Sequence, residues 1–166
     1  MEEILIVAGL LFLIDKGNKT VQTMGKEYPN PEGKTRGLRN NNVGNIKETG
    51  TTWKGQIKPT GDKPFAQFQN PVWGVRAMII IVKRTYRNLG LKTIRQIVSR
   101  YAPPIENLTE SYINSVSRQT GIDPDRIIST ESEYQKVIQA MAVHENGLPV
   151  TKVLPDLLYI EANNLI

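Results

Sequence analysis

The chain has 166 residues, enough for one hydrophobic core, and its content of 39% hydrophobic and 22% charged residues is typical of a globular protein. It contains no cysteine and a single histidine, His144. A disulfide framework, a thiolate nucleophile and a zinc site of cysteine and histidine ligands are excluded, and we expect neither metal nor cofactor. The formal net charge of +5 favours association with a polyanion such as nucleic acid, anionic lipid or a bacterial cell wall.

Residues 1–15 differ from the rest of the chain because they contain an apolar run from Ile4 to Ile14, preceded by two glutamates. The run is shorter than the ~20 apolar residues of an ordinary spanning helix, and it lacks the basic flank and the small-x-small cleavage site of a signal peptide. We expect an apolar helix here that contacts membrane lipid or a partner protein. Three alternatives remain open: a short or tilted membrane anchor, a helix inserted into one leaflet or a partner, and a helix buried in the fold.

The next segment, residues 16–35, is predicted to be a polar linker because glycines and prolines recur in it without apolar periodicity. A main domain is predicted for residues 36–150. Within it, the stretch from Ile46 to Phe68 places aromatic and aliphatic residues between glycines and alternates apolar and polar residues near its end, which predicts a small β-hairpin lobe.

Helices are predicted for most of the remaining chain, because apolar residues repeat at intervals of three and four between start and stop signals. Asn70-Pro71 is typical of a helix start and Gly90 of a helix end, and Thr130 with Glu133 predicts a capping box. The predicted helices run from 71 to 89, 93 to 101, 109 to 121, 131 to 147 and 154 to 166, with a brief helical turn at 123–124. Residues 151–166 form the C-terminal amphipathic helix of a fold that we expect to be α+β and mainly α.

A carboxylate lies at the end of the apolar stripe of the helix predicted from residue 131. The stripe repeats at i, i+3, i+4 and i+7 and comprises Tyr134, Val137, Ile138 and Met141, and Glu145 follows it. Burial beside this stripe and the partial negative charge of a helix C-terminus both disfavour ionisation, which raises the pKa of a carboxyl group and suits a general acid. The alternative is a frayed last turn in which Glu145 reaches water or pairs with a lysine.

Several motifs in the main domain resemble those of one known family. Residues 36–47 read R-G-L-R-N-N-N-V-G-N-I-K and are followed by Trp53-x-Gly55, which is similar to the R-G-x-R-N-N-N-P-G-N-I-R…W-x-G signature of phage-encoded, virion-associated peptidoglycan hydrolases. Further matching blocks occur in the same order at residues 62–68, 74–77, 101–112 and 143–147, so the resemblance covers residues 36–149. Val43 departs from the pattern, because the family usually has proline there.

The resemblance implies a lysozyme-like helical domain with a small β-hairpin lobe, in which a catalytic glutamate ends a helix and an asparagine-rich segment lies in the lobe. In related glucosaminidases this segment follows the glutamate, whereas here Asn45 precedes Glu145 by 100 residues. A circular permutation that moves the glutamate helix to the C-terminal side would explain the order. The resemblance then makes Glu145 the catalytic acid, with Glu48 the next candidate and Glu106 a distant third.

The candidate substrate-binding residues are mainly asparagines and aromatic residues, because amides pair with sugar hydroxyl and N-acetyl groups and aromatic rings stack on sugar faces. They are Asn41, Asn42, Asn45, Trp53, Tyr101 and His144. The asparagines and aromatic residues also have a structural alternative. Asparagines next to glycine are typical of turns, and aromatic residues at helix and strand spacing more often belong to the core.

The activity that the resemblance implies is cleavage of the β-1,4 bond between MurNAc and GlcNAc in peptidoglycan, during phage entry or lysis. Only one strong acid candidate is present, which favours a lytic transglycosylase that uses a single carboxylate. A muramidase or glucosaminidase, in which water attacks, is the close rival, and Glu48 and Asp62 are candidates for its second carboxylate.

The resemblance further implies a protein of the virion that is associated with a membrane and acts at the host cell envelope or periplasm. Residues 1–15 would then contact membrane lipid or the membrane and capsid proteins of the virion. One alternative is a catalytically inactive structural protein of the virion with a lysozyme-like fold. A nucleic-acid binder is disfavoured, because the chain has no nucleic-acid motif and its basic residues are spread along the sequence.

Overall fold

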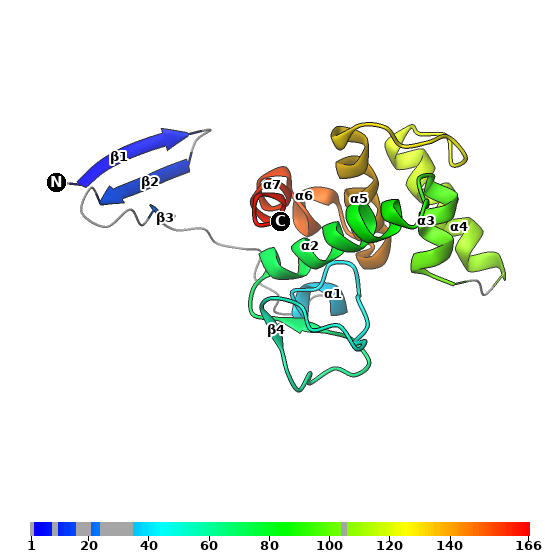
Figure 1. The fold of residues 1–166 in the computed structure, drawn as a ribbon, viewed down its shortest axis with the longest axis horizontal. Coiled ribbons are helices and arrows are strands. Elements are labelled where there is room, and N and C mark those ends of the chain that lie inside the picture. Colours follow the sequence, from blue (N-terminus) through cyan, green and yellow to red (C-terminus); the bar gives the residue numbers. More distant parts are fainter. Residues whose placement is uncertain (1, 8–9, 16–20, 24–34, 104–105) are drawn as a thin grey trace. The chain divides into compact units, whose positions relative to one another are not determined.

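The computed structural model describes residues 2–7, 10–15, 21–23, 35–103 and 106–166. Most contacts fall within one of two units, Met1–Asn30 and Pro31–Ile166 (Figure 1). The boundary between them lies inside the predicted linker. The C-terminal helix predicted for residues 151–166 belongs to the larger unit together with the main domain.

The smaller unit contains an antiparallel sheet with the strand order β1-β2-β3. Strand β1 (Glu2–Val7) pairs with β2 (Leu10–Asp15) over its whole length, and β3 (Val21–Thr23) pairs with β2. The structure therefore has strands where the sequence predicted an apolar helix. Isoleucine and valine favour extended backbone, and a glycine at position 9 disfavours a helix interior, so these residues oppose the helix preference of the leucines in the run.

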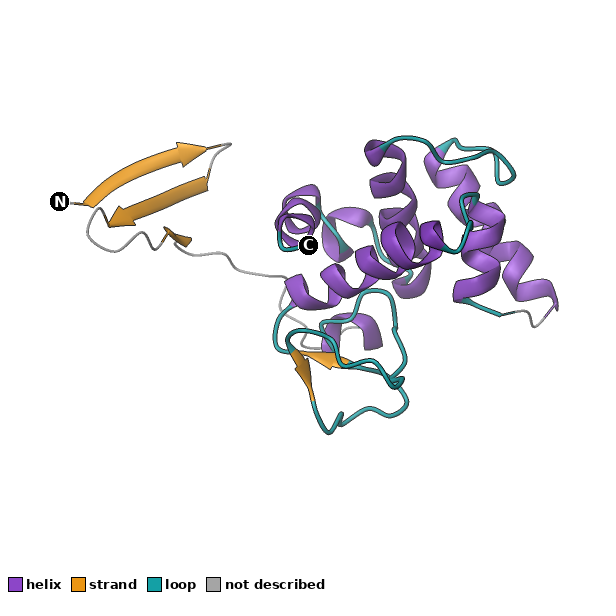
Figure 2. Cartoon of the chain, viewed as in Figure 1, coloured by secondary structure: helices purple, strands orange, loops and turns teal. Residues whose placement is uncertain are grey.

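The larger unit is mainly helical with a two-stranded antiparallel sheet, which confirms the predicted α+β class (Figure 2). Its elements are α1 (Arg36–Arg39), β4 (Gln56–Ile57), β5 (Gln67–Phe68), α2 (Pro71–Ile79), the π-helical segment η1 (Ile80–Tyr86), α3 (Ile94–Tyr101), α4 (Glu106–Thr120), α5 (Glu131–Asn146), α6 (Val150–Val153) and α7 (Asp156–Asn164). Across the described parts of the chain, no helix combines the length and the apolar character needed to cross a membrane.

The larger unit differs from the sequence prediction in a few local details. The helix predicted from residue 71 continues beyond Ile79 as the π-helical segment η1, and α4 begins at Glu106 instead of residue 109. A turn replaces the helical turn predicted at residues 123–124. The side chain of Asp123 accepts a hydrogen bond from the backbone N–H of Asp125 at 2.8 Å, and this local pairing competes with helix formation.

Helix α5 supplies one wall of the core. The four residues of its predicted apolar stripe are at most 2% exposed, and each such side chain stabilises the fold by about 1.5–3 kcal/mol relative to exposure. The predicted capping box is present, because Thr130 accepts a hydrogen bond from the backbone of Glu133 and Glu133 bonds back to Thr130. Helix α4 packs against α5, α3 against α4, and α7 against α2.

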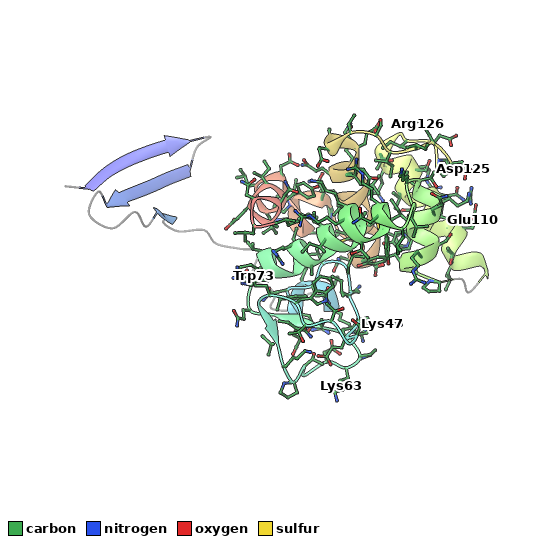
Figure 3. The ribbon with its side chains drawn as sticks, viewed as in Figure 1. Lys47, Lys63, Trp73, Glu110, Asp125 and Arg126 are labelled. Atoms are coloured by element: carbon green, nitrogen blue, oxygen red, sulfur yellow. The ribbon has the colours of Figure 1, made fainter. Side chains whose placement is uncertain are left out.

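Two glycines let the small lobe approach α2 closely. A Cβ atom at Gly74 on α2 would lie 1.9 Å from the carbonyl oxygen of Asn41, so only glycine fits. Gly55, with φ of +72°, lies against the ring of Trp73, which Figure 3 labels at the start of α2. Both glycines belong to the motifs quoted above, and the structure gives each a packing reason.

Candidate active site

Glu145 lies in the last turn of α5 and contacts the asparagine-rich loop, residues 40–45, which leads into the small lobe. The side-chain Nδ2 of Asn45 donates to Oε2 of Glu145 at 3.0 Å and to its backbone carbonyl oxygen at 3.2 Å. The helix ends at Gly147, whose φ of +63° terminates the helix in a left-handed conformation. The carboxyl group of Glu145 is therefore fixed at a helix end by an amide that is 100 residues away in sequence.

The pKa of Glu145 is raised above the ordinary carboxyl value of 4.5 because burial disfavours the charged form. Hydrogen bonds from Asn45 and Tyr112 oppose this effect and lower the pKa, without cancelling it. A carboxyl group with a raised pKa keeps its proton to higher pH than a solvated one. This is the property that general acid catalysis requires.

The first half of the asparagine-rich loop has a structural role. Asn42 is 0% exposed, and its side-chain Nδ2 donates to the carbonyl oxygens of Ile46 and Ala66, both at 2.9 Å. Its Oδ1 accepts from the backbone N–H of Ile46 at 2.9 Å. Asn41, with φ of +52°, donates to the carbonyl oxygen of Phe68 at 2.9 Å. Asn42 was a candidate sugar-binding residue, but its amide is fully used by the backbone and is inaccessible to a ligand.

Asn146 joins the same loop to α5 and was missed by the sequence analysis. Its Nδ2 donates to the carbonyl oxygens of Val43 and Ala142, both at 2.8 Å, and its Oδ1 accepts from the hydroxyl of Thr35 at 2.6 Å. The side chain is 6% exposed. A polar residue directly after Glu145, four positions beyond the alanine at 142, was the available signal. The side chain of Asn146 fixes the lobe to α5, the helix that carries Glu145.

A cavity of about 510 Å³ extends from Glu145 between the lobe and the helices. Residues with polar or charged groups on its wall include Asn45, Lys47, Tyr86, Arg100, Tyr101 and Glu145. The hydroxyl of Tyr101 donates to the carbonyl oxygen of Gly44 at 2.5 Å, so the ring is held in place against the loop. Lys47, Tyr86 and Arg100 were not predicted as site residues.

His144 lies on a second hollow, of about 370 Å³, which shares Ala102 and Pro103 with the first. Its ring stacks on that of Tyr112, with 3.8 Å between centroids and 16° between planes. Burial lowers the pKa of His144, which favours the neutral imidazole. His144 therefore contributes an aromatic face next to the Glu145 cavity and does not line it.

The other predicted residues lie outside the Glu145 cavity. Glu48 accepts a hydrogen bond from Gln56 at 3.1 Å, and the backbone N–H of Trp53 donates to the same glutamine at 3.0 Å. Asp62 accepts from Asn40 at 2.9 Å and pairs with Arg36 at 3.3 Å. Glu48, Trp53 and Asp62 therefore do not line the cavity. The Glu106 side chain lies outside the described part of the chain, and the described residues contain no group of three metal-ligating side chains.

The fold and the site define a mainly helical α+β protein with a small lobe and a half-buried acid facing a cavity. The chain is 44% identical to Protein P5 of Pseudoalteromonas phage PM2 over 115 residues, which are 68% of this chain and 71% of that protein. No family model matches the chain. The chain belongs to the same family as this bacteriophage protein.

Proposed function

We propose that the protein cleaves the glycan strands of bacterial peptidoglycan at the β-1,4 bond between MurNAc and GlcNAc, with Glu145 as general acid. The observation that supports this proposal most is the carboxyl group itself. It lies on the wall of a 510 Å³ cavity, its pKa is raised by burial, and Asn45 holds one of its oxygens. Positioned proton transfer of this kind contributes about 10²- to 10⁴-fold to a rate.

The arrangement favours a reaction with a single protein carboxylate. Glu145 protonates the glycosidic oxygen, the N-acetyl group of the substrate assists departure of the leaving sugar, and the Glu145 carboxylate then accepts the proton of the muramyl 6-hydroxyl as it attacks C1. The product is a 1,6-anhydro sugar. The described residues of the cavity wall include no second carboxylate, and Glu48 and Asp62 are engaged elsewhere. A muramidase or glucosaminidase, in which water attacks, is the rival reaction.

Asn45 is well placed to contact the substrate as well as the acid. It lines the cavity, and its Oδ1 is buried without a hydrogen-bond partner. An unsatisfied buried acceptor is costly unless a ligand supplies a donor. Because Oδ1 is buried in the structure, a sugar hydroxyl or the N–H of an N-acetyl group would reach it only if the loop shifts when the glycan binds.

Membership of a bacteriophage family supports a setting in the virion, where the protein would act on the host envelope during entry or lysis. In this setting residues 1–15 would contact membrane lipid or the membrane and capsid proteins of the particle, now as strands of a small sheet. The alternative is a structural virion protein without activity, which gives no functional reason for the raised pKa of Glu145.

The test is the variant Glu145→Gln on purified sacculi. Glutamine keeps the size and the contact with Asn45 but delivers no proton, so we expect cleavage to fall at least about 10²-fold while the protein stays folded. Glu110→Gln is the control, because Glu110 pairs with Arg95 and does not line the Glu145 cavity. Wild-type turnover by Glu145→Gln would refute the proposal.

Mass spectrometry of the released fragments separates the two reactions, because anhydro ends and reducing ends differ by one water. Glu48→Gln gives an independent answer. A small loss of turnover agrees with the single-carboxylate reaction, and a loss as large as that of Glu145→Gln would indicate a hydrolase with two carboxylates.

A further inference from the structure

Two basic side chains, Lys47 and Arg100, line the cavity that contains Glu145. Lys47 belongs to the small lobe, where its backbone pairs with Phe65, and Figure 3 labels it at the edge of the lobe. Arg100 comes from the last turn of α3. The two cations thus reach one cavity from different elements.

Neither cation has a carboxylate partner among the described residues, although several other basic side chains do. Lys83 and Arg87 pair with Glu131, and Arg126 pairs with Glu133. Glu145 is the one acidic residue described on the cavity wall, and its carboxyl group is engaged by Asn45. Two positive charges in a concave site, without a carboxylate partner in the part of the chain that the structure describes, favour an anionic ligand.

The alternative explanation is that each cation is an ordinary solvated charge on the surface and binds no ligand. Arg100 lies at a helix C-terminus, where a positive charge is favourable in any case. That reason does not apply to Lys47, which is outside the helices. The charge of Arg100 also acts on the cavity itself, because it lowers the pKa of Tyr86 on the wall against the larger effect of burial, which raises it.

We propose that Lys47 and Arg100 form a subsite for a carboxylate on the muramyl residue of the glycan, an inference that rests on the proposed function. A guanidinium fork binds a carboxylate through two parallel hydrogen bonds, and an ammonium adds a compact charge beside it. MurNAc carries a lactyl group, which ends in a carboxylate or in a peptide with carboxylates, whereas GlcNAc carries neither. The subsite therefore distinguishes the two sugars of the alternating strand and selects which β-1,4 bond lies next to Glu145.

Binding measurements on the full chain test this subsite, with Glu145→Gln as the background so that no ligand is consumed. The ligands are a neutral chitooligosaccharide, intact peptidoglycan strands, strands whose carboxyl groups have been amidated, and strands stripped of peptide, which expose the lactyl carboxylate. We expect the double change Lys47→Gln/Arg100→Gln to weaken binding of carboxylated strands about tenfold, the effect of losing charged hydrogen bonds. Binding of chitooligosaccharide and of amidated strands should not change.

The matched control is Lys92→Gln/Arg118→Gln, which removes two exposed positive charges from residues that do not line this cavity. Equal weakening by the control would mean that overall charge attracts the wall, and it would overturn the subsite. Equal weakening of the neutral ligand would overturn it too. If the protein binds stripped strands more tightly than intact strands, the subsite binds the lactyl carboxylate. If it binds intact strands more tightly, the subsite binds a carboxylate of the peptide.

The two proposals fail in different ways. If the wild-type protein cleaves sacculi and Lys47→Gln/Arg100→Gln neither weakens binding of carboxylated strands nor changes cleavage, the subsite is wrong and the proposed function stands. If the wild-type protein cleaves no glycan but the double change still weakens binding of carboxylated strands selectively, the subsite stands and the enzymatic function is wrong. Absence of any glycan binding overturns both.

Discussion

The two halves of the asparagine-rich loop present the same amide chemistry in different surroundings. In the first half, every polar atom of the Asn42 side chain bonds to the protein backbone. In the second half, Asn45 gives its donor to Glu145 and leaves its acceptor without a partner. The difference indicates that the amide of Asn42 holds the loop together, whereas the amide of Asn45 holds the carboxyl group of Glu145. It also predicts that the two halves respond differently to substitution.

The largest loss of stability is expected for Asn42→Ala. The change removes three hydrogen bonds and leaves the carbonyl oxygen of Ala66 and the backbone N–H of Ile46 without a partner in a buried loop, whereas the Ile46 carbonyl oxygen keeps the N–H of Ala66. The free energy of unfolding should therefore fall by about 3 kcal/mol. Denaturant unfolding measures it. Asn41→Gly is the control, because it keeps the left-handed backbone, removes one hydrogen bond and should cost about 1 kcal/mol. Similar losses for both would contradict the structural role of Asn42.

Asn146→Ala should come next, with a loss of about 2 kcal/mol, because the loop and α5 lose a shared buried amide. Turnover should fall as well, since Asn45 depends on this junction to reach Glu145. Thr35→Val removes only the hydroxyl donor and should cost less. An Asn146→Ala protein with reduced stability but full turnover would show that the junction does not position the acid.

Asn45→Gly should change activity more than stability. Glycine tolerates the φ of +48° at this position, and we expect less than about 1 kcal/mol of stability loss against about a tenfold loss of turnover. Because the Asn45 hydrogen bond lowers the pKa of Glu145, its removal should raise that pKa and move the alkaline limb of the activity profile to higher pH. Asn45→Asp, which adds a negative charge, should move it further. An unchanged alkaline limb would mean that the Asn45 hydrogen bond does not set the pKa of Glu145.

The smallest effect concerns the stability of Glu145→Gln. Burial raises the pKa of Glu145 in the folded state, so the wild-type protein loses stability as pH rises from the ordinary carboxyl pKa of 4.5 through the raised value. Glutamine does not titrate. The melting temperature of the variant relative to wild type should therefore be higher at neutral pH than below pH 4.5, by thermal unfolding. If the melting temperatures of variant and wild type differ by the same amount at neutral pH and at acidic pH, Glu145 is well solvated.

The sequence predicted that Glu145 lies at the end of the buried stripe of α5, because helix periodicity and a capping box fix which face of the helix is buried. The helical stripe needs only local spacing, and Glu145 continues it to the end of the helix. Residue type alone could not separate Asn42 from Asn45, because both are asparagines in a turn and hydrogen-bond partners are set by the fold. Both asparagines belong to the turn, in which the backbone N–H of Asn45 donates to the carbonyl oxygen of Asn42, but only the side chain of Asn45 contacts Glu145.

The cavity wall was harder to predict than the acid. Tyr86 continues the apolar repeat of the preceding helix, and the change to π-helical bonding in η1 alters which side chains face the wall. Lys47 and Glu48 are neighbours in a loop that spacing cannot orient; the first lines the cavity and the second bonds to Gln56. The N-terminal apolar run fits helix or strand by hydrophobicity alone, and its β-branched residues were the better guide.

The contact between Asn45 and Glu145 also bears on how the protein is made. Ribosomes deliver the N-terminal part first, so the loop appears long before the helix that completes it. The chain between these two residues must close a loop of 100 positions before acid and amide meet. Contacts of such long sequence separation form late and slow folding. A nascent chain that ends before α5 lacks both Glu145 and Asn146, so docking of α5 is the step that turns an inert polypeptide into one with an acid in its cavity.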